Sequence, residues 1–305
     1  MDAIEKNLLM QVADLHKVPE GAYNIRTNGK SAARNTTANI DIVNKTDKPG
    51  IDIIIKAGTK NESVHIPVIL SESGLTETVY NDFYIGEGAE VTIVAGCGIH
   101  NCGTQESRHD GVHSFFLAEG AKVKYVEKHY GEGDGTGANV MNPKTVVRLA
   151  KGSTLEMDTV QIKGVDSTVR ETDAEVAEGA TLIVRDKIMT HGTQSAIARF
   201  RVVLVGDGAS ANVISRSVAK EDSHQDFYSA MIGNGACYGH TECDAIIMDN
   251  ASVSAAPEIT ANHVDASMIH EAAIGKIAGE QLMKLMSLGL TEKEAEEQIV
   301  NGFLK

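Results

Sequence analysis

The sequence predicts a mainly β protein built from stacked strands, and three observations support this expectation. A glycine followed by Ala or Ser recurs in EGAEVTIVAG, EGAKVKYVEK, KGSTLEMDTV, EGATLIVRDK, DGASANVISR and NGACYGHTEC, at positions 88, 120, 152, 179, 208 and 235. The steps of 32, 32, 27, 29 and 27 residues indicate an internal repeat. Apolar and polar residues alternate after each glycine, as they do in half-buried strands. Because the chain has no Trp, 6 Phe and 7 Tyr but 29 Gly, small and branched side chains must fill its interior in repeated layers.

Each repeat therefore holds a strand with alternating inward residues, followed by a tight corner at the next glycine. Such units stack into a β-helix, or β-solenoid, in which each rung hydrogen-bonds only to its neighbours. An antiparallel β-sandwich is the alternative, and periodicity alone does not separate the two. The inward positions expected in three of the repeats are Val91, Ile93 and Ala95, then Val123 and Tyr125, then Leu155 and Met157.

Charge and cysteine content exclude several classes of function. The formal net charge of -14 would repel a nucleic-acid backbone or an anionic membrane surface. The amino terminus is acidic where a secretory signal would be basic, and no apolar run approaches membrane-spanning length, so we expect a cytoplasmic protein. Four cysteines in 305 residues are too few for a disulfide framework, which leaves thiols available for metal or sulfur chemistry.

The amino-terminal segment predicts one amphipathic helix over residues 2–17, ended by Pro19-Glu20-Gly21. Ile4, Leu8, Val12 and Leu15 fall on one face of it. Asn28-Gly29 then predicts a tight turn. The neighbouring GKS is not a phosphate-binding loop, because Asn24 stands where that motif requires glycine, so we do not expect this chain to bind ATP itself.

Two irregular insertions are expected to interrupt the repeat. Residues 131–137, GEGDGTG, contain two acids and no Lys, which favours a solvent loop over a phosphate cradle. Residues 96–113 offer either a thiolate and imidazole metal site or a His-rich surface loop, and their spacing fits no standard zinc pattern. The candidate ligands in that insertion are Cys97, His100, Cys102, His109 and His113.

The carboxy-terminal quarter opens with Cys243 in an apolar run, a turn at Asp249-Asn250, and Pro257, which only an edge strand or a strand end tolerates. The periodicity then changes to 3.6 and predicts a helix over residues 274–288, with Ile274, Ala278, Leu282 and Leu285 on one face and Gly289 at its end. A second helix over residues 292–301, which carries Ile299, is expected from a capping box formed by Thr291 and Glu294, with Leu290 and Ala295 as a hydrophobic staple. The chain should therefore end as a helical hairpin.

This quarter resembles the carboxy-terminal part of the SufB/SufD family, the scaffold proteins of Suf-type iron-sulfur cluster assembly. The resemblance depends on TECDAIIM from position 241, Pro257, the HEA of 270–272, and GKIAGEQLMKLMSLGLTEKEAEEQIVNGF, and it extends more weakly back to about residue 21. It implies a right-handed parallel β-helix with a short amino-terminal helix and a carboxy-terminal helical hairpin. The expected parts are a helix in residues 1–20, the β-helix in 21–265, and a helical SufC-binding region in 266–305.

The resemblance also implies site residues. Cys243 matches a cysteine proposed in SufB to receive sulfur and hold the cluster, and His270 with Glu271 matches a His-Glu pair suited to ligate iron. The competing interpretation is that Cys243 is a buried structural thiol and that Glu271 only favours the positive end of a following helix. Cys237 shares strand parity with Cys243, whereas His240 should point to the opposite face. The secondary metal candidates are Cys237, His240, Cys97 and Cys102.

In function, the resemblance implies a scaffold subunit without enzymatic activity that holds a transient iron-sulfur cluster and works with SufC, an ABC-type ATPase. The expected partners also include a second copy of the chain in a homodimer and a sulfur donor of the cysteine desulfurase system. Ala150 stands where SufB has a second functional cysteine, which puts a sulfur path through the helix interior in doubt. The alternatives are a metal-free dimerisation module and a β-solenoid enzyme acting on polysaccharide, which usually requires a secretory signal. SufC contacts are expected at Ile274, Ile277, Leu282, Leu285, Ile299 and Phe303.

Overall fold

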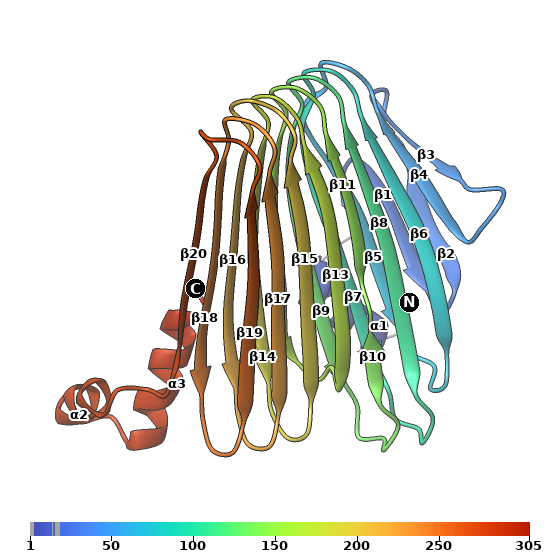
Figure 1. Cartoon of the computed structure of the whole chain (residues 1–305). Helices are drawn as coiled ribbons and strands as arrows, with labels where there is room; N and C mark the ends of the chain where they lie inside the picture. The colour runs from blue at the N-terminus through green and yellow to red at the C-terminus, as the bar shows by residue number, and fades with distance from the viewer. Residues whose placement is uncertain (1–2, 14, 16–18) are drawn as a thin grey trace.

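The chain folds into a β-solenoid of about eight turns, with a short amino-terminal helix and two carboxy-terminal helices (Figure 1). This computed structural model describes residues 3–13, 15 and 19–305, so residues 2, 14, 16 and 17 of the expected first helix lie outside the described part. Over these residues no helix is long and apolar enough to cross a membrane.

Two sheets face each other along the whole solenoid. The first sheet runs in the order β2-β1-β5-β7-β9-β12-β14-β16-β18-β20. Its strands are β1 (Ala22–Thr27), β2 (Lys30–Asn35), β5 (Lys60–Leu70), β7 (Glu90–His100), β9 (Lys122–Glu132), β12 (Thr154–Lys163), β14 (Thr181–Thr190), β16 (Ser210–Ala219), β18 (Tyr238–Ile247) and β20 (Ser267–Gly275).

The second sheet runs in the order β19-β17-β15-β13-β10-β8-β6-β4-β3, and β11 also lies between β13 and β8. Its strands are β3 (Ile40–Asn44), β4 (Gly50–Ile55), β6 (Thr76–Ile85), β8 (Ser107–Leu117), β10 (Asn139–Met141), β11 (Lys144–Leu149), β13 (Ser167–Val176), β15 (Ser195–Leu204), β17 (His224–Gly233) and β19 (Ser252–Ala261). Among the described strands, only the hairpins β1-β2 and β3-β4 pair antiparallel. Because every later rung pairs in parallel with the next, the antiparallel sandwich is excluded and the predicted β-helix is confirmed.

The repeated glycines lie at the corners where the chain passes from the second sheet to the first. Gly88, Gly120, Gly152, Gly179 and Gly208 all have φ between 61° and 70°, a conformation that costs other residues free energy. Each of these glycines donates its N–H to a carbonyl of the next rung, as Gly120 does to Lys151 O at 3.0 Å. Gly235 differs, because its φ is not positive and glycine serves there to leave room beside Asp207 and Gly206.

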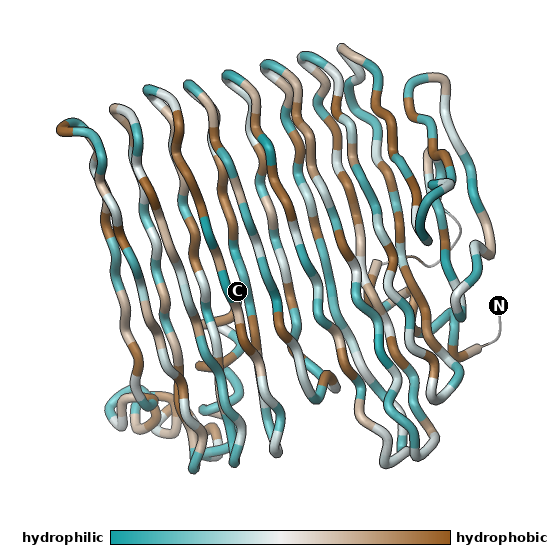
Figure 2. Tube along the Cα trace, turned by 45° about the vertical axis from the view of Figure 1, so that its right-hand side comes forward, coloured by the Kyte–Doolittle hydropathy of each residue, from teal (hydrophilic) through white to brown (hydrophobic). Residues whose placement is uncertain are grey.

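Alternating side chains from both sheets fill the space between them. Apolar positions recur on neighbouring strands (Figure 2). All seven inward positions expected from the sequence are buried. The few aromatic residues stack between rungs, with the ring centroids of Phe83 and Phe115 4.5 Å apart. The interior is therefore a layered core, as the composition predicted.

One part of this interior is polar and charged. Arg170 on β13 lies 2.9 Å from Glu127 on β9 and 3.6 Å from Asp186 on β14, and all three side chains are at most 4% exposed. The Tyr125 hydroxyl donates to Glu127 Oε1 at 2.8 Å and lies 2.7 Å from His113 Nδ1. Because removing one member of a buried ionic group leaves an uncompensated charge, we expect this network to contribute strongly to the stability of the fold.

The buried imidazole in this network should make folding stability depend on pH. Burial lowers the pKa of His113 to about 4 from an unperturbed value of 6.5, so the unfolded chain binds an extra proton between these values. The free energy of unfolding should therefore fall as the pH drops from about 6.5 to about 4, by roughly 3 kcal/mol for this residue. Urea unfolding at both pH values should show this loss reduced in His113→Gln and unchanged in His263→Gln, which alters an exposed histidine. An equal loss in both variants would contradict the assignment.

The amino-terminal helix α1 (Ala3–Ala13) covers the outer face of the first sheet beside β5, β7 and β9. Leu8 and Val12 are fully buried there, as predicted, whereas Ile4 is exposed. A Cβ atom at Gly96 would lie 2.7 Å from Val12 O, so the absence of a side chain at this position allows α1 to pack closely on β7. The expected turn is confirmed, because Asn28 and Gly29 both have positive φ between the antiparallel strands β1 and β2.

The first carboxy-terminal helix begins later than the periodicity predicted, whereas the second begins at residue 292 as expected. Ile274 lies in β20, and the solenoid continues to Gly275, past the expected boundary at residue 265. Helix α2 spans Gly279–Ser287 and helix α3 spans Glu292–Phe303. Pairing with β18 explains the error, because a neighbouring strand with free backbone groups decides the conformation of residues whose own pattern fits a helix. Gly289 has a φ of 99°, and the capping box of Thr291 and Glu294 is present, so these two predictions are confirmed.

The predicted insertion at residues 96–113 is mostly strand. Residues up to His100 complete β7 and residues from Ser107 begin β8, which leaves a loop over residues 101–106. The interpretation of Cys97 as a loop residue was therefore wrong, since it is buried between the sheets. The second insertion, residues 131–137, begins in β9 and continues as a loop.

Candidate functional site

The strands that carry the predicted site lie at the carboxy-terminal end of the first sheet. β20 is the edge strand and pairs only with β18, while β19 is the edge of the second sheet, where Pro257 meets the prediction of an edge position. The inward positions of both edge strands are only partly covered, and Ile259 and Ile274 remain 40% and 38% exposed. The solenoid therefore has an open end with unpaired strand edges, which favours pairing with another chain.

Cys243 and His270 share the inner face at this edge. Cys243 is 1% exposed and pairs with Ala272 of β20, while Thr241 pairs with His270, so the two candidate ligands lie on adjacent strands two positions apart in register. Burial, and next Asp244, raise the pKa of the Cys243 thiol to about 11. Burial lowers the pKa of His270, and no group among the described residues hydrogen-bonds to its buried Nδ1. An imidazole with an unpartnered ring nitrogen and a thiol on the neighbouring strand offer donor chemistry that fits iron.

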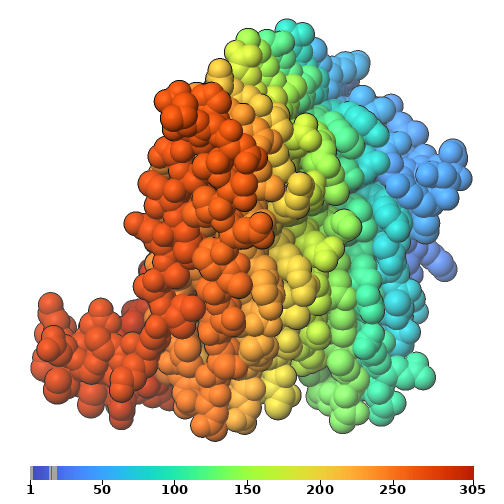
Figure 3. Space-filling model, viewed as in Figure 1, coloured from blue at the N-terminus to red at the C-terminus, as the bar shows by residue number. Residues whose placement is uncertain are grey.

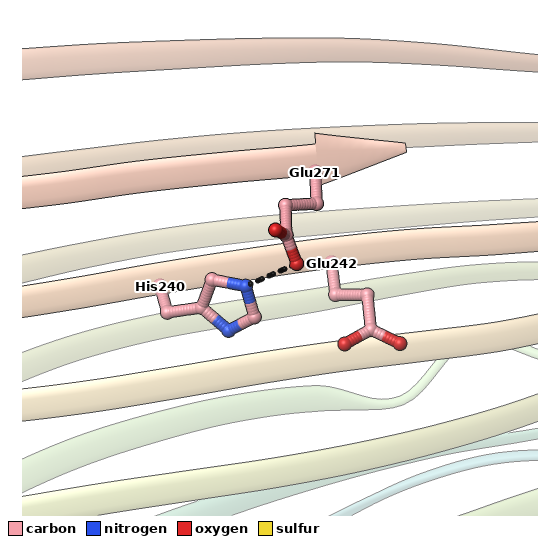
Figure 4. A group of neighbouring side chains, drawn as sticks. All are labelled: His240, Glu242 and Glu271. Carbon is pink, nitrogen blue, oxygen red and sulfur yellow. Dashed lines mark hydrogen bonds and ion pairs between the residues drawn. The ribbon is translucent and has the colours of Figure 1, made fainter. Parts of the chain in front are cut away.

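Glu271 points to the other face of the sheet, as strand alternation requires. There it meets His240 and Glu242 of β18, and one ligand atom from each of the three lies within 4.8 Å of the other two (Figure 4). His240 Nε2 is 3.2 Å from Glu271 Oε2. The three predicted ligands thus occupy two faces of one sheet edge, with Cys243 and His270 inside and Glu271 outside.

The outer group is arranged to receive a cation. His240 Nδ1 lies 2.9 Å from Asn212 Oδ1, an acceptor, so Nδ1 carries a proton, and the other ring nitrogen, Nε2, faces the Glu271 carboxylate. This contact requires either a proton or a metal ion between the nitrogen and the carboxylate. Burial and the neighbouring Asp244 raise the pKa of Glu242, and Arg216 is 3.9 Å away. The hydrogen bond to Asn212 orients the ring in the way that fixes metal-ligating histidines.

Sequence reasoning placed His240 and Cys237 on opposite faces, and the structure agrees, with Cys237 buried inside. The sequence analysis did not identify Glu242 as a candidate ligand. The available signal was its position two residues after His240, which places both side chains on the same face of β18, and Glu242 pairs with Glu271 of β20. The interpretation of Glu271 as a helix-end residue was wrong, because it lies within β20. Cys237 and Cys243 are six residues apart on one extended segment, about 20 Å, so they cannot share one metal ion.

The other secondary candidates do not converge on one site. Cys97 is buried between the sheets, and His109 and His113 point inward from β8, where they contact Glu77 and Tyr125. Cys102 is exposed on the loop after β7. The predicted metal site over residues 96–113 is therefore divided between the interior and the surface.

The helices form a lobe that projects beside the open end (Figure 3). Val300 of α3 and Leu304, the residue that follows this helix, pack on Val218 of β16, and Ile277 and Phe303 join this cluster. Of the other expected contact residues, Leu282, Leu285 and Ile299 are half-buried. Helix α2 buries no residue fully, and the apolar side chains that it exposes are Met283 (64%), Met286 (42%) and, at its end, Leu288 (75%). The periodicity of the sequence identified the half-buried face of α2, with Leu282 and Leu285, and did not identify the exposed apolar face with Met283 and Met286.

The family model for the SufBD core domain of SUF-system FeS cluster assembly matches residues 72–303, which include the edge strands and both carboxy-terminal helices. The chain belongs to the SufBD family. Iron-sulfur cluster assembly SufBD family proteins are 29% identical over 240 residues in Methanothermobacter thermautotrophicus (78% of this chain and 57% of the relative) and 30% identical over 231 residues in Archaeoglobus fulgidus (75% and 61%). A relative of the same description in Methanocaldococcus jannaschii is 25% identical over 256 residues, covering 83% of this chain and 79% of the relative.

This SufBD chain spans about three fifths of the length of the first two relatives. Family membership supports a role in iron-sulfur cluster assembly. The resemblance stated from the sequence is thereby confirmed.

Proposed function

We propose that this SufBD chain is a scaffold subunit that assembles or transfers a nascent iron-sulfur cluster at the edge formed by β18 and β20. The observation that carries the proposal is that Cys243 and His270 lie on the inner face of adjacent strands, two positions apart in register, and that the buried Nδ1 of His270 has no partner among the described groups. Iron and sulfur are the substrates here. The chain itself is proposed to have no enzymatic activity.

The two faces of the edge have different parts in this proposal. His240, Glu242 and Glu271 offer nitrogen and oxygen ligands at the surface, which suit ferrous iron on arrival. Cys243 offers one thiolate on the inner face, and since its pKa is raised to about 11, a bound metal must displace the thiol proton. A cluster held by one thiolate and weaker ligands is easier to hand on than one held by four thiolates.

Anaerobic purification, followed by an absorption spectrum and an iron and sulfide assay, tests the proposal. We expect a charge-transfer absorption band and both elements after reconstitution with ferrous iron and sulfide. A chain that stays colourless and binds neither element would favour the metal-free dimerisation module. Turnover of an acidic polysaccharide would favour the enzyme alternative.

We propose a homodimer formed through the open end of the solenoid. The unpaired edges of β19 and β20 and the partly exposed Ile259 and Ile274 support this, because a second copy would cover them. Light scattering at micromolar concentration should give twice the chain mass of 32.5 kDa. A monomer under these conditions would contradict the pairing.

We further propose that α2 docks a SufC-like ABC ATPase, since this chain has no nucleotide motif and α2 exposes apolar side chains. Replacing Met283 and Leu288 together by Glu should weaken co-purification with the ATPase by at least about tenfold, as loss of two buried apolar anchors predicts. The melting temperature should not change, because both residues are exposed. A matched control, Lys293→Glu, alters an exposed residue of α3 and should leave binding near its original level. Unchanged binding in the double variant would place the docking surface elsewhere.

A further inference from the structure

Cys102 differs from the other three cysteines in its surroundings. It is exposed on the loop between β7 and β8, whereas Cys97, Cys237 and Cys243 are buried. Burial raises the pKa of Cys97 well above its ordinary value and that of Cys243 to about 11, which disfavours their thiolates. Since the thiolate is the nucleophile, a sulfur electrophile arriving from solvent would meet one accessible thiol among the described residues.

This thiol has a base beside it, and a carboxylate faces that base. Cys102 Sγ lies 2.9 Å from His100 Nε2, and His100 Nδ1 lies 3.4 Å from Glu132 Oε1. That Nδ1 is buried and forms no hydrogen bond within the described part of the chain, so the Glu132 carboxylate is the charge that faces it. Glu132 is itself held by the Tyr130 hydroxyl at 3.1 Å and the Asn7 amide at 3.4 Å. A nucleophile, a base and a carboxylate placed to stabilise the protonated base form an arrangement that activates thiols.

The loop that carries Cys102 is fixed by the next rung. Asn101 donates its amide to Gln105 O and Gly137 O, and its own carbonyl accepts from Gly135 N at 3.1 Å. Side chains at positions 133, 135 and 137 would begin 2.0–2.3 Å from carbonyl oxygens of the Cys102 loop, which explains the alternating glycines of GEGDGTG. The stretch that the sequence left as a flexible loop is a backbone support for the thiol.

We propose that Cys102, with His100 as its base and Glu132 as the positioning residue, accepts sulfane sulfur from a persulfide donor. This inference rests on the proposed function, because assembly of a cluster consumes sulfur. His100 Nε2 takes the proton of Cys102 Sγ, and the thiolate attacks the terminal sulfur of R–S–SH. A new S–S bond forms at Cys102, the S–S bond of the donor breaks, and the leaving thiolate recovers the proton from His100 as R–SH. The sulfur changes partner with no net oxidation.

The test uses the whole apo-chain and a low-molecular-weight persulfide such as cysteine persulfide. After brief exposure and alkylation, peptide mass spectrometry should locate one added sulfur atom on Cys102 and none on the three buried cysteines. Cys102→Ser should lose the added sulfur, and Cys97→Ser, the matched control, should keep it. Sulfur appearing first on Cys243, or equally on all four cysteines, would overturn the proposal.

A second measurement separates activation from mere exposure. The rate of iodoacetamide modification at Cys102 should fall about tenfold or more in His100→Asn. Glu132→Gln should move the pH of half-maximal rate upward, because the imidazolium loses its counter-charge. The nearby Cys102 thiol lowers the pKa of the Asp134 carboxyl, and the negative charge of that carboxylate opposes the thiolate, so Asp134→Asn should move that pH downward. Unchanged rates and profiles in all three variants would show an unactivated surface thiol.

Failure of this proposal and failure of the proposed function are distinguishable. Reconstitution with ferrous iron and inorganic sulfide bypasses the acceptor, so Cys102→Ser should still form a cluster under those conditions. If the original chain forms no cluster from iron and sulfide, the proposed function fails whatever happens at Cys102.

Discussion

Replacing Cys243 by Ser should remove the iron-sulfur cluster while leaving the solenoid folded. The exchange is nearly isosteric but eliminates the thiol that lies two positions from His270 in register on the neighbouring strand. Iron and sulfide measured after anaerobic reconstitution should fall to background. Because Cys243 is 1% exposed, a serine hydroxyl there should also lower the free energy of unfolding by about 1–2 kcal/mol, which urea unfolding would measure.

Cys237→Ser is the matched control for this prediction. Cys237 is also buried and faces the same interior, but it lies about 20 Å along the chain from Cys243. Its replacement should cost similar stability and preserve the cluster. A cluster that survives Cys243→Ser would make Cys243 a structural thiol and would require another assembly site, and loss of the cluster in Cys97→Ser would point to the opposite end of the solenoid.

Features that depend on local backbone geometry were predictable from the sequence. The corner glycines predicted the rungs because a positive φ strongly favours glycine. Pro257 predicted an edge strand because proline has no backbone N–H to donate to a neighbouring strand. The capping box of Thr291 and Glu294 specified the start of α3 for the same reason. Each of these signals is local, so one sequence suffices to find it.

Features that depend on contacts between rungs were not predictable in the same way. Ile274 was expected in a helix and lies in a strand because β18 offers it a pairing edge. Glu271 was expected beside Cys243, yet strand alternation sends it to the outer face, where it meets His240. Cys102, His100 and Glu132 come together only because β7 and β9 are adjacent rungs. The 32 positions between His100 and Glu132 equal the repeat step from Gly88 to Gly120, so this approach could be found only by aligning the repeats with one another and not from a local motif.

The buried charges inside the solenoid lead to the largest stability effect that we expect. Arg170→Met should lower the free energy of unfolding by about 3–5 kcal/mol, because Glu127 and Asp186 would remain buried without their shared cation. Arg201→Met is the control: this arginine also pairs with a carboxylate, Asp173 at 3.0 Å, but its side chain is 56% exposed, so its loss should cost at most about 1 kcal/mol.

The pH dependence of the Arg170→Met effect identifies its cause. Burial opposes ionisation of Glu127, yet His129, Arg170 and His113 overcome it and hold the pKa of Glu127 well below its ordinary value. This carboxylate therefore contributes stability that is present above the unfolded pKa of about 4.3 and is lost as the pH falls through the folded value. The difference between the original chain and Arg170→Met should be largest near pH 7 and shrink below about pH 4, where the carboxylates take up protons. A difference that stays constant from pH 7 to pH 3 in urea unfolding would mean that lost packing of the arginine side chain, and not its charge, sets the cost.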